Sequence, residues 1–429
     1  MNRKILHLAI PSIISNITVP LLGLVDMAIV GHLGSAAYIG AIAVGGMLFN
    51  LIYWLFGFLR MGTSGITSQA YGRRDLRGVF LALIRSVGVG LAVGGSLLLL
   101  SPVIRWIAFQ VIEATPEVAG WASTYFCIGV WGAPAVLALY GFMGWFVGMQ
   151  NSRFPMLIAI TQNLVNIAAS LWLVFGLGMR VEGVALGTVI AQYAGFLMAI
   201  MLAWRYYGRL WFPFTWVQVW ARPAMRRFFS VNKDIFFRTL CLVCVTTFFT
   251  STGARQGDLV LAVNTLIMQL FTLFSYVMDG FAYAAEALTG RFIGASNRMA
   301  LNRCVRALFG WGIAFAGLFT LAYGIWGESF LALLTDERPV IEAAADYWVW
   351  ALAIPFCGFA AFLWDGIFIG ATATRQMLMA MFFASFLFFT IYFGLTVRLG
   401  NHALWLAFLV YLLSRGLVQW LLWRRLLRR

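Results

Sequence analysis

The chain has 429 residues, of which 62% are apolar and only 10% are charged, and its formal net charge at pH 7 is +15. Soluble domains carry roughly 25% charged residues, so this composition excludes a soluble fold. A membrane-spanning helix needs about 20 apolar residues, and about twelve such spans would use most of the chain. The length therefore leaves no room for a second, soluble catalytic domain.

The first apolar run begins directly after Met1-Asn2-Arg3-Lys4 and continues to about Val30. This run is longer than the apolar core of a signal peptide, so it predicts a first span instead of a cleaved leader. The net positive charge does not indicate nucleic-acid binding, because the basic residues lie in short segments between apolar runs. The cysteines lie in or beside apolar runs without the spacing of a metal site, so we interpret them as packing residues and expect no metal.

Apolar runs between charged or turn-rich breaks predict the spans in chain order. Two of these runs, 36–71 and 258–290, exceed the bilayer thickness and predict helices that tilt or project from the membrane. The predicted spans are 5–30, 36–71, 79–103, 119–149, 154–177, 183–204, 235–254, 258–290, 304–334, 343–371, 376–397 and 402–423.

Lys and Arg gather in alternate connections along the chain. The segments 73–77 and 205–233 are rich in Arg, whereas acidic residues collect at 113–117 and 336–346. Because cytoplasmic loops carry the excess of Lys and Arg, the basic segments are predicted to be cytoplasmic. The pattern predicts a multi-pass membrane protein with both termini in the cytoplasm and an even number of spans.

The longest hydrophilic stretch, 205–234, is basic, contains two prolines and predicts a cytoplasmic linker between an N-terminal lobe at 1–204 and a C-terminal lobe at 235–429. The two lobes also match in sequence at a constant interval in residue number, which we call the repeat offset. We therefore predict an all-α integral membrane protein of about twelve helices in two pseudo-symmetric six-helix bundles. The pairs matched at this offset are Tyr125/Tyr347, Ala138/Ala360, Gly144/Gly366, Phe146/Phe368, Gly148/Gly370 and Arg153/Arg375.

Span 1 carries an acid, Asp26, deep in apolar sequence and on the same helix face as Ser12, Asn16 and Gly23. Pro20 is placed to kink this helix. Ionisable groups inside a membrane are functional candidates, and desolvation disfavours a charged carboxylate, so Asp26 is suited to binding and releasing a proton. The alternative is that Asp26 caps the outer end of the span.

Spans 5 and 6 carry further polar side chains at helical spacing. Asn163, Asn166 and Ser170 share a face of span 5, and Thr188 and Gln192 lie one turn apart on span 6. Each could form an ordinary interhelical hydrogen bond. Together with Asp26 they are the candidates for proton or ion coupling.

The C-terminal lobe has three acids within apolar runs, Asp279, Glu286 and Asp365, and Tyr283 shares a helix face with the first two. Carboxylates and aromatic rings would suit an organic cation through charge pairing and cation–π contact. Alternatively the acids hold the structure together by pairing with arginines, including an interlobe pair of Asp279 with Arg60. The other arginines considered for such pairs are Arg85, Arg238 and Arg306.

Several strings, spread over the whole chain, resemble the DinF-type branch of the multidrug and toxic compound extrusion (MATE) family. They are VDMAIVGHLG around Asp26, FLRMGTSGITSQAYGRRD at 58–75, NIAASLWLVFGLG at 166–178, VEGVALGTVIAQ at 181–192, DGFAYAAEALTGRFIGA at 279–295 and WDGIFIGATATR at 364–375. The resemblance implies a proton site made by an acid on span 1, an Asn and an acid on span 5, and a Thr on span 6. Asp26, Asn166 and Thr188 match it, whereas Ser170 stands in place of the second acid.

The resemblance implies a cation-coupled antiporter, driven by a proton or sodium gradient, that exports amphipathic or cationic small molecules by alternating access. We expect no enzymatic activity, no catalytic residues and no bound cofactor. The expected partners are the substrate, the coupling cation and membrane lipid, with the chain acting as a monomer and binding no nucleic acid. The alternatives are a lipid-linked precursor flippase of the same superfamily and a membrane-embedded enzyme.

Overall fold

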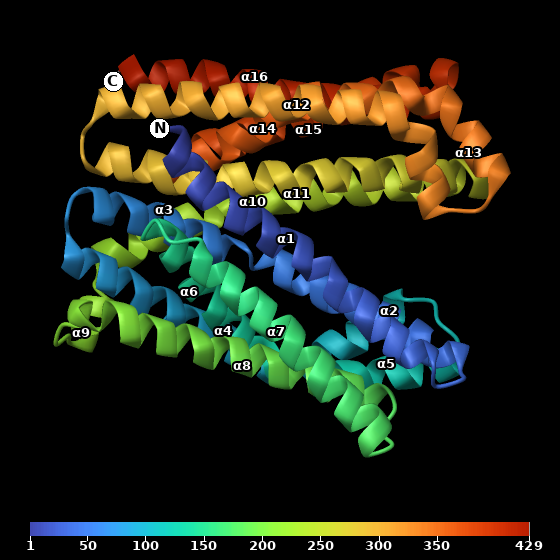
Figure 1. Ribbon diagram of the computed structural model, residues 1–429, viewed down its shortest axis with the longest axis horizontal. Coiled ribbons are helices and arrows are strands. Elements are labelled where there is room, and N and C mark those ends of the chain that lie inside the picture. The colour runs from blue at the N-terminus through green and yellow to red at the C-terminus, as the bar shows by residue number, and fades with distance from the viewer. Residues whose placement is uncertain (429) are drawn as a thin grey trace. The chain divides into compact units, whose positions relative to one another are not determined.

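The computed structural model describes residues 1–428 and consists of long α-helices joined by short turns (Figure 1). Within these residues, 12 helical spans are long and apolar enough to cross a membrane. A helix satisfies its backbone hydrogen bonds internally, which the hydrocarbon of a bilayer demands. The predicted all-helical membrane fold is thus confirmed. Arg429, the last residue of the predicted C-terminal lobe, lies outside the described residues.

The first half of the chain and the linker contain the following elements: α1 (Asn2–Gly31), α2 (Ala36–Leu55), α3 (Phe58–Gly72), α4 (Leu76–Val111), α5 (Pro116–Gly129), η1 (Val130–Gly132), α6 (Ala133–Gly148), α7 (Arg153–Leu171), η2 (Trp172–Gly176), α8 (Val181–Tyr207), η3 (Gly208–Leu210) and α9 (Trp216–Val219). The second half contains α10 (Arg222–Arg255), α11 (Asp258–Gly294), α12 (Arg298–Leu334), α13 (Arg338–Ala344), η4 (Ala345–Tyr347), α14 (Trp348–Gly370), α15 (Thr374–Leu399) and α16 (Asn401–Arg428).

The backbone turns recur in the two halves at the repeat offset found in the sequence. The left-handed conformation occurs at Arg74 and again at Ser296, with φ of 60° and 53°. It also occurs at Gln150 and at Thr372, with φ of 65° and 52°. Non-glycine residues seldom adopt this conformation, so its recurrence at matched positions shows that the two halves fold alike.

Glycines bring the central helix of each half close to its neighbour. A Cβ at Gly144 on α6 would collide with the carbonyl oxygen of Arg60 on α3. At the matched position, a Cβ at Gly366 on α14 would collide with the carbonyl oxygen of Ala282 on α11. Small residues permit such close backbone approach between membrane helices, where packing rather than hydrophobic burial holds helices together.

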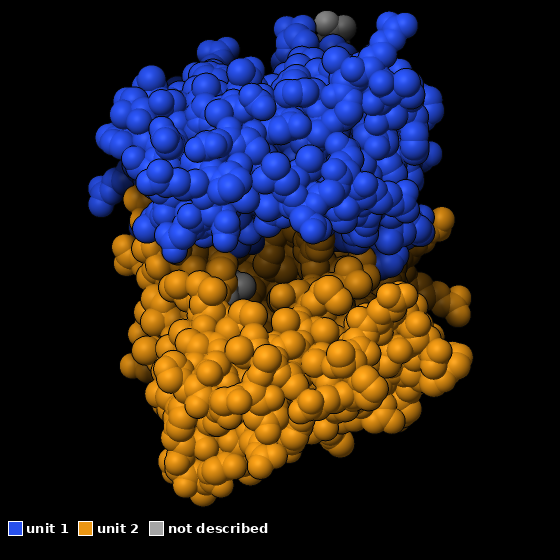
Figure 2. Space-filling view, turned by 90° about the vertical axis from the view of Figure 1, so that its right-hand side faces the viewer, with its two compact units in different colours: residues 1–9, 233–429 blue, residues 10–232 orange. Residues whose placement is uncertain are grey.

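The chain divides into two compact units, coloured separately in Figure 2. One unit comprises Ile10–Asn232, and the other comprises Met1–Ala9 together with Lys233–Arg429. The first turns of α1 therefore belong to the unit built mainly from the second half of the chain, and the first turns of α10 belong to the unit built from the first half. Helices α1 and α10 each contribute to both units.

The predicted run 36–71 is two helices, because α2 ends at Leu55 and α3 begins at Phe58. The amide of Gly57 donates to the carbonyl of Trp54 at 3.1 Å and closes a tight turn between them. The corresponding run in the second half is the continuous helix α11, where Asp279 stands at the position of Gly57. Glycine favours a break in a helix, which explains the difference.

The predicted linker, 205–234, contains helical structure. Helix α10 begins at Arg222, with Pro223 in its first turn, where a missing amide proton costs no helical hydrogen bond. The short helix α9 is fastened to α4, because the guanidinium of Arg85 donates to the carbonyl of Val219 at 2.9 Å. Arg77 also donates to Gln218 Oε1 at 2.9 Å. Arg85, considered as a partner for an acid, thus holds the linker.

Candidate functional site

Helices α7 and α8 approach closely at the polar residues predicted from the sequence. A Cβ at Gly187 on α8 would collide with the hydroxyl of Ser170 on α7. One turn earlier, a Cβ at Gly183 would lie 3.1 Å from a methyl group of Val174. These glycines allow the backbones to approach, so that side chains of α7 can reach Thr188 on α8.

A chain of hydrogen bonds joins three of the candidate residues to Asp26 on α1. The Ser170 hydroxyl donates to Asn166 Oδ1 at 2.7 Å. Asn166 Nδ2 donates to Thr188 Oγ1 at 3.5 Å, and Thr188 Oγ1 donates to Asp26 Oδ2 at 3.5 Å. The last two bonds are at the outer limit of hydrogen-bond length and therefore weak. The structure thus brings together Asp26, Asn166, Ser170 and Thr188 within one unit.

Asp26 is buried in an environment that offers little compensation for a negative charge. The residue is 5% exposed, and its Oδ1 has no hydrogen-bond donor among the described residues. Thr188 has a single hydroxyl proton and a shorter alternative acceptor, the carbonyl of Val184, at 3.1 Å. A buried carboxylate with so few donors is costly, so binding of a proton or a small cation there is favourable.

The remaining coupling candidates lie beside this cluster. Asn163 Nδ2 donates to the carbonyl of Thr18 on α1 at 3.0 Å, two residues before Pro20. Helix α1 is continuous through Pro20 (Figure 1). Gln192 lies against Gly132 of η1, where a Cβ would collide with the Gln192 amide oxygen. Asn163 thus ties α7 to α1 near the proline, and Gln192 packs against a different element.

The matched positions of the second half carry a different chemistry. At the repeat offset, Asp26, Asn166 and Ser170 correspond to Phe248, Phe388 and Tyr392. The ring of Phe248 lies 5.9 Å from that of Phe388 and 5.2 Å from that of Tyr392, both edge-on. The same place in the fold is therefore filled by aromatic rings, so packing of these helices does not require an acid there.

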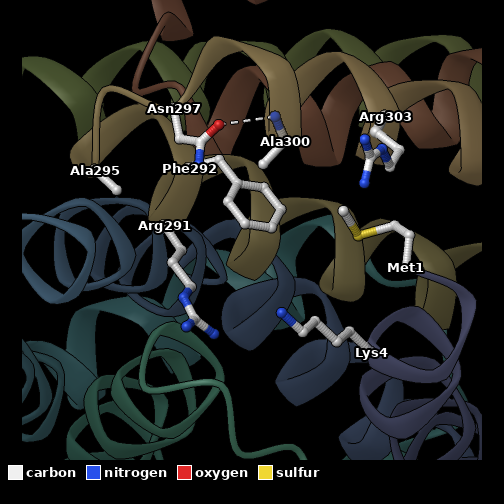
Figure 3. A pocket seen from close by; sticks show the side chains of 8 residues that line it. All are labelled: Met1, Lys4, Arg291, Phe292, Ala295, Asn297, Ala300 and Arg303. Carbon is white, nitrogen blue, oxygen red and sulfur yellow. Dashed lines mark hydrogen bonds between the residues drawn. The ribbon is translucent and has the colours of Figure 1, made fainter.

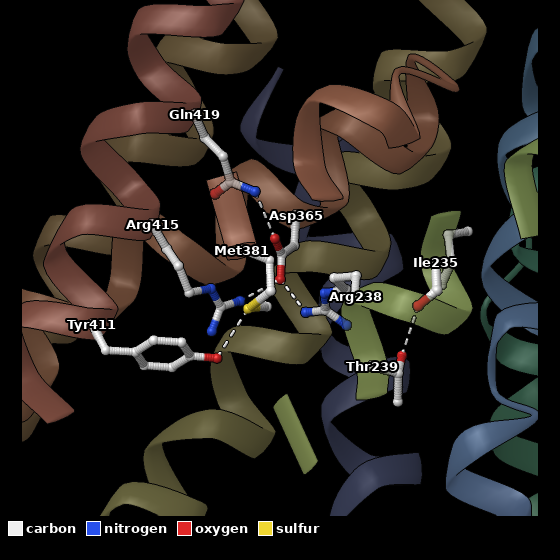
Figure 4. A network of polar contacts seen from close by, with 8 residues as sticks. All are labelled: Ile235, Arg238, Thr239, Asp365, Met381, Tyr411, Arg415 and Gln419. Carbon is white, nitrogen blue, oxygen red and sulfur yellow. Dashed lines mark hydrogen bonds and ion pairs between the residues drawn. The ribbon is translucent and has the colours of Figure 1, made fainter. Parts of the chain in front are cut away.

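The second half has its own buried polar cluster, centred on Asp365 of α14 (Figure 4). Its carboxylate accepts hydrogen bonds from Arg238 on α10 and Arg415 on α16 and forms ion pairs with both. Gln419 donates to the other carboxylate oxygen at 2.7 Å. The Arg415 guanidinium also lies 5.4 Å from the ring centroid of Tyr411. Asp365 therefore pairs with side chains of its own unit and links three helices.

The other C-terminal candidates lie along α11 and differ in burial. Glu286 is 1% exposed, whereas Asp279 and Tyr283 are half-buried. Arg60 lies on α3 in the unit of Ile10–Asn232, and Asp279 lies in the other unit. Their interlobe pairing stays a prediction.

Sequence reasoning did not identify two groups of site residues. The Tyr125 side chain on α5 is buried near Asp26 and Thr188, although the sequence marked it only as a repeat match. Arg415 and Gln419 were not singled out either, but their placement one helical turn apart within an apolar run was a usable signal.

The profile of the MatE family matches residues 11–172 and 235–396, one stretch in each half. The chain is 38% identical over 428 residues to the DNA damage-inducible protein F of Escherichia coli (strain K12), which covers 99% of this chain and 92% of that protein. The chain belongs to the MATE family. It is a MATE transporter homologous to the DinF protein.

More distant relatives and solved structures also match the chain. Protein DETOXIFICATION 44, chloroplastic, of Arabidopsis thaliana is 24% identical over 386 residues, covering 87% of this MATE chain and 72% of that protein. Among solved structures, the Vibrio cholerae MATE transporter VcmN in the bent form matches with a TM-score of 0.87 at 17% identity, covering 99% of this chain and 97% of that one. A crystal structure of MATE in the bent conformation matches with a TM-score of 0.88 at 19% identity, covering 99% and 95% of the two chains.

Proposed function

We propose that this MATE transporter is a cation-coupled antiporter, with Asp26 as the group that binds the coupling proton, and that it exports amphipathic or cationic small molecules. The single observation that carries the proposal is the contrast between the halves. Asp26 is a buried acid with few donors, and the matched place in the second half is packed with aromatic rings. A costly polar cluster that packing does not need is best explained by a role in transport.

The geometry supports a simple protonation cycle at Asp26. In the ionised state its carboxylate needs the Thr188 hydroxyl as a donor, and in the protonated state it can itself donate to that oxygen. The Thr188 proton can then turn to the carbonyl of Val184, 3.1 Å away on the same helix. Protonation would thereby reverse the direction of the hydrogen bond that links α1 and α8, and the strength of this link would depend on the charge of Asp26.

Two gradients can drive such a cycle. A membrane potential contributes about 2.3 kcal/mol per charge moved across 100 mV, and a pH gradient adds to it. With a single carboxyl group in the cluster, one proton neutralises the site, whereas a sodium ion would prefer several oxygen ligands. The presence of Ser170 in place of a second acid leaves Asp26 as the one carboxyl group of the cluster, and we propose a proton as the coupling ion.

The C-terminal unit supplies the groups proposed for the substrate. Asp279 and Tyr283 are half-buried on α11, so a ligand that approaches this helix could contact both side chains. Asp365 is occupied by two arginines and is proposed to be structural. The placement of both termini in the cytoplasm fits the distribution of Lys and Arg. We propose that the chain acts as a monomer in the bacterial inner membrane.

Transport by purified protein in proteoliposomes tests the proposal. A fluorescent organic cation should move against its gradient when a pH gradient is imposed, and an equal sodium gradient without a pH difference should give no net movement. Transport driven by sodium alone would contradict proton coupling. Movement of a lipid-linked precursor, with no transport of any tested cation under either gradient, would favour a flippase instead.

A further inference from the structure

The unit that contains most of the second half has a cavity of about 420 Å³, bordered by the first turn of α1, the end of α11 and the start of α12. Three of its eight lining residues are basic, Lys4, Arg291 and Arg303, and none of the eight is acidic. Figure 3 shows these basic side chains around the ring of Phe292. Like charges that share a cavity repel one another, and a bound anion would offset this repulsion.

The matched place in the other unit arranges its basic side chains differently. There Gln69 on α3 accepts a hydrogen bond from Arg227 on α10 at 2.9 Å. At the repeat offset, Arg291 takes the position of Gln69. A neutral acceptor is thus replaced by a cation, while the donor Arg227 corresponds to the uncharged Ile5, so the charge of this pair of positions is unchanged and the cation now lies on α11.

A second exchange removes a negative charge. Asp75 Oδ1 accepts from the amide of Gly78 at 2.8 Å, and at the matched position Asn297 Oδ1 accepts from the amide of Ala300 at 2.9 Å. Both side chains cap the start of a helix, and capping needs only the oxygen atom. The neutral cap keeps the helix start intact and leaves no carboxylate at the cavity wall.

Two further exchanges complete the comparison. Arg303 takes the position of Leu81 and adds a cation, whereas Ala295 takes the position of Arg73 and removes one. The small side chain of Ala295 is part of the cavity wall. Summed over these four matched positions, the cavity carries more positive charge than its counterpart in the other half. It also has a smaller side chain, Ala295, where the counterpart has Arg73.

We propose that this cavity binds a phosphate-bearing anion, held by Lys4, Arg291 and Arg303. Guanidinium groups bind phosphate oxygens in pairs, and a Lys ammonium adds a point charge. The headgroup of an anionic phospholipid and a soluble phosphate share this chemistry. Met299, which lies in the chain between the lining residues Asn297 and Ala300, is 72% exposed, and an exposed apolar side chain at this turn suits the lipid source.

Binding at this site would act on α1. Lys4 lies in the segment Met1–Ala9, which packs in the same unit as α11 and α12, while the rest of α1 carries Asp26. A phosphate that bridges Lys4 to Arg291 and Arg303 would hold this segment in place. The ligand would therefore stabilise one arrangement of the helix that carries the proposed proton site.

Binding can be measured without transport, so the test does not depend on the proposed function. The full-length protein, in a zwitterionic detergent, would be titrated with phosphatidylglycerol and analysed by native mass spectrometry. Each basic residue near a charged lipid contributes about a fivefold change in affinity, so Lys4→Gln/Arg303→Gln should bind about 25-fold more weakly. The charge-conserving variant Lys4→Arg/Arg303→Lys should bind like the wild type.

The matched control is Arg3→Gln/Arg298→Gln. Arg3 and Arg298 are exposed on the same two helices and lie outside the cavity lining, so this variant loses the same charge and should keep its affinity within twofold. Equal weakening in the control and the cavity variant would show a general surface-charge effect and overturn the proposal, as would no binding by the wild type. Displacement of the lipid by inorganic phosphate would identify a soluble ligand, and lipid binding that phosphate does not displace would identify a headgroup site.

Discussion

Asp26 and Phe248 stand at matched positions of the two halves, and only the first is ionisable. Phe248 packs edge-on against Phe388, while Asp26 receives a weak hydrogen bond from Thr188. One scaffold thus accommodates a carboxyl group or an aromatic ring at the same place. Architecture alone does not explain Asp26, and its chemistry is the basis of the predictions below.

Tyr125→Phe tests the tyrosine beside the cluster. The phenol is buried near Asp26 and Thr188. Removal of one neutral hydrogen-bonding group should change the free energy of proton binding at Asp26 by about 1 kcal/mol. We expect a change of about fivefold in the proton concentration that half-activates transport, with unchanged thermal stability. The transport rate as a function of pH measures this. An unaltered pH profile would show that Tyr125 only fills space.

Gly187→Ala tests the close approach of α7 and α8. The added Cβ would collide with the Ser170 hydroxyl, so the helices must separate at the coupling cluster. Overpacking of this kind costs about 1–3 kcal/mol and should reduce coupled transport strongly. Gly95→Ala is the control, because a Cβ there meets no atom within 4 Å. Equal transport by both variants would contradict the importance of this contact.

Asp365→Asn tests the ion network of the second half. The change leaves Arg238 and Arg415 without their shared carboxylate and should cost about 3–5 kcal/mol. The double variant Asp365→Asn/Arg238→Gln should lose less than the sum of the single changes, because it removes one of the uncompensated charges. Thermal unfolding of the purified variants measures the cycle. Strictly additive losses would show that the pair is not coupled.

Cysteine labelling tests the proposed orientation. In a cysteine-free background, Arg73→Cys and Arg209→Cys should react with an impermeant reagent only from the cytoplasm. Glu113→Cys and Glu337→Cys should react only from outside, because the basic segments are proposed to be cytoplasmic. All four native residues are exposed, so the reagent can reach each one. Reaction of both pairs from the same side would contradict the topology.

The number of spans and the position of Asp26 could be predicted because each leaves a local signal, and the repeat could be predicted because residues of the two halves match at a constant offset. Long apolar runs report spans, and an acid within such a run is conspicuous. The break before Phe58 and the helical start of α10 at Arg222 could not be predicted from hydropathy, which does not register a turn within an apolar run or a helix within a basic one.

Long-range partners could not be read from the sequence either. Arg238 and Arg415 are separated from Asp365 by 127 and 50 positions, and only the packing of α10, α14 and α16 brings them together. Tyr125 reaches Asp26 in the same way, from a helix that the sequence does not connect with it. These contacts depend on tertiary geometry, which periodicity along a single helix does not encode.

The most direct test of the central claim is proton movement during transport by Asp26→Asn. The amide keeps the shape of the carboxyl group but cannot bind and release a proton, while Asp258→Asn makes the same change at the exposed start of α11. In proteoliposomes that contain a pH-sensitive dye, substrate export by the wild type and by Asp258→Asn should be accompanied by proton movement in the opposite direction. Asp26→Asn should fold normally and show neither. Substrate-coupled proton movement at the wild-type rate in Asp26→Asn would contradict the claim that Asp26 carries the coupling proton.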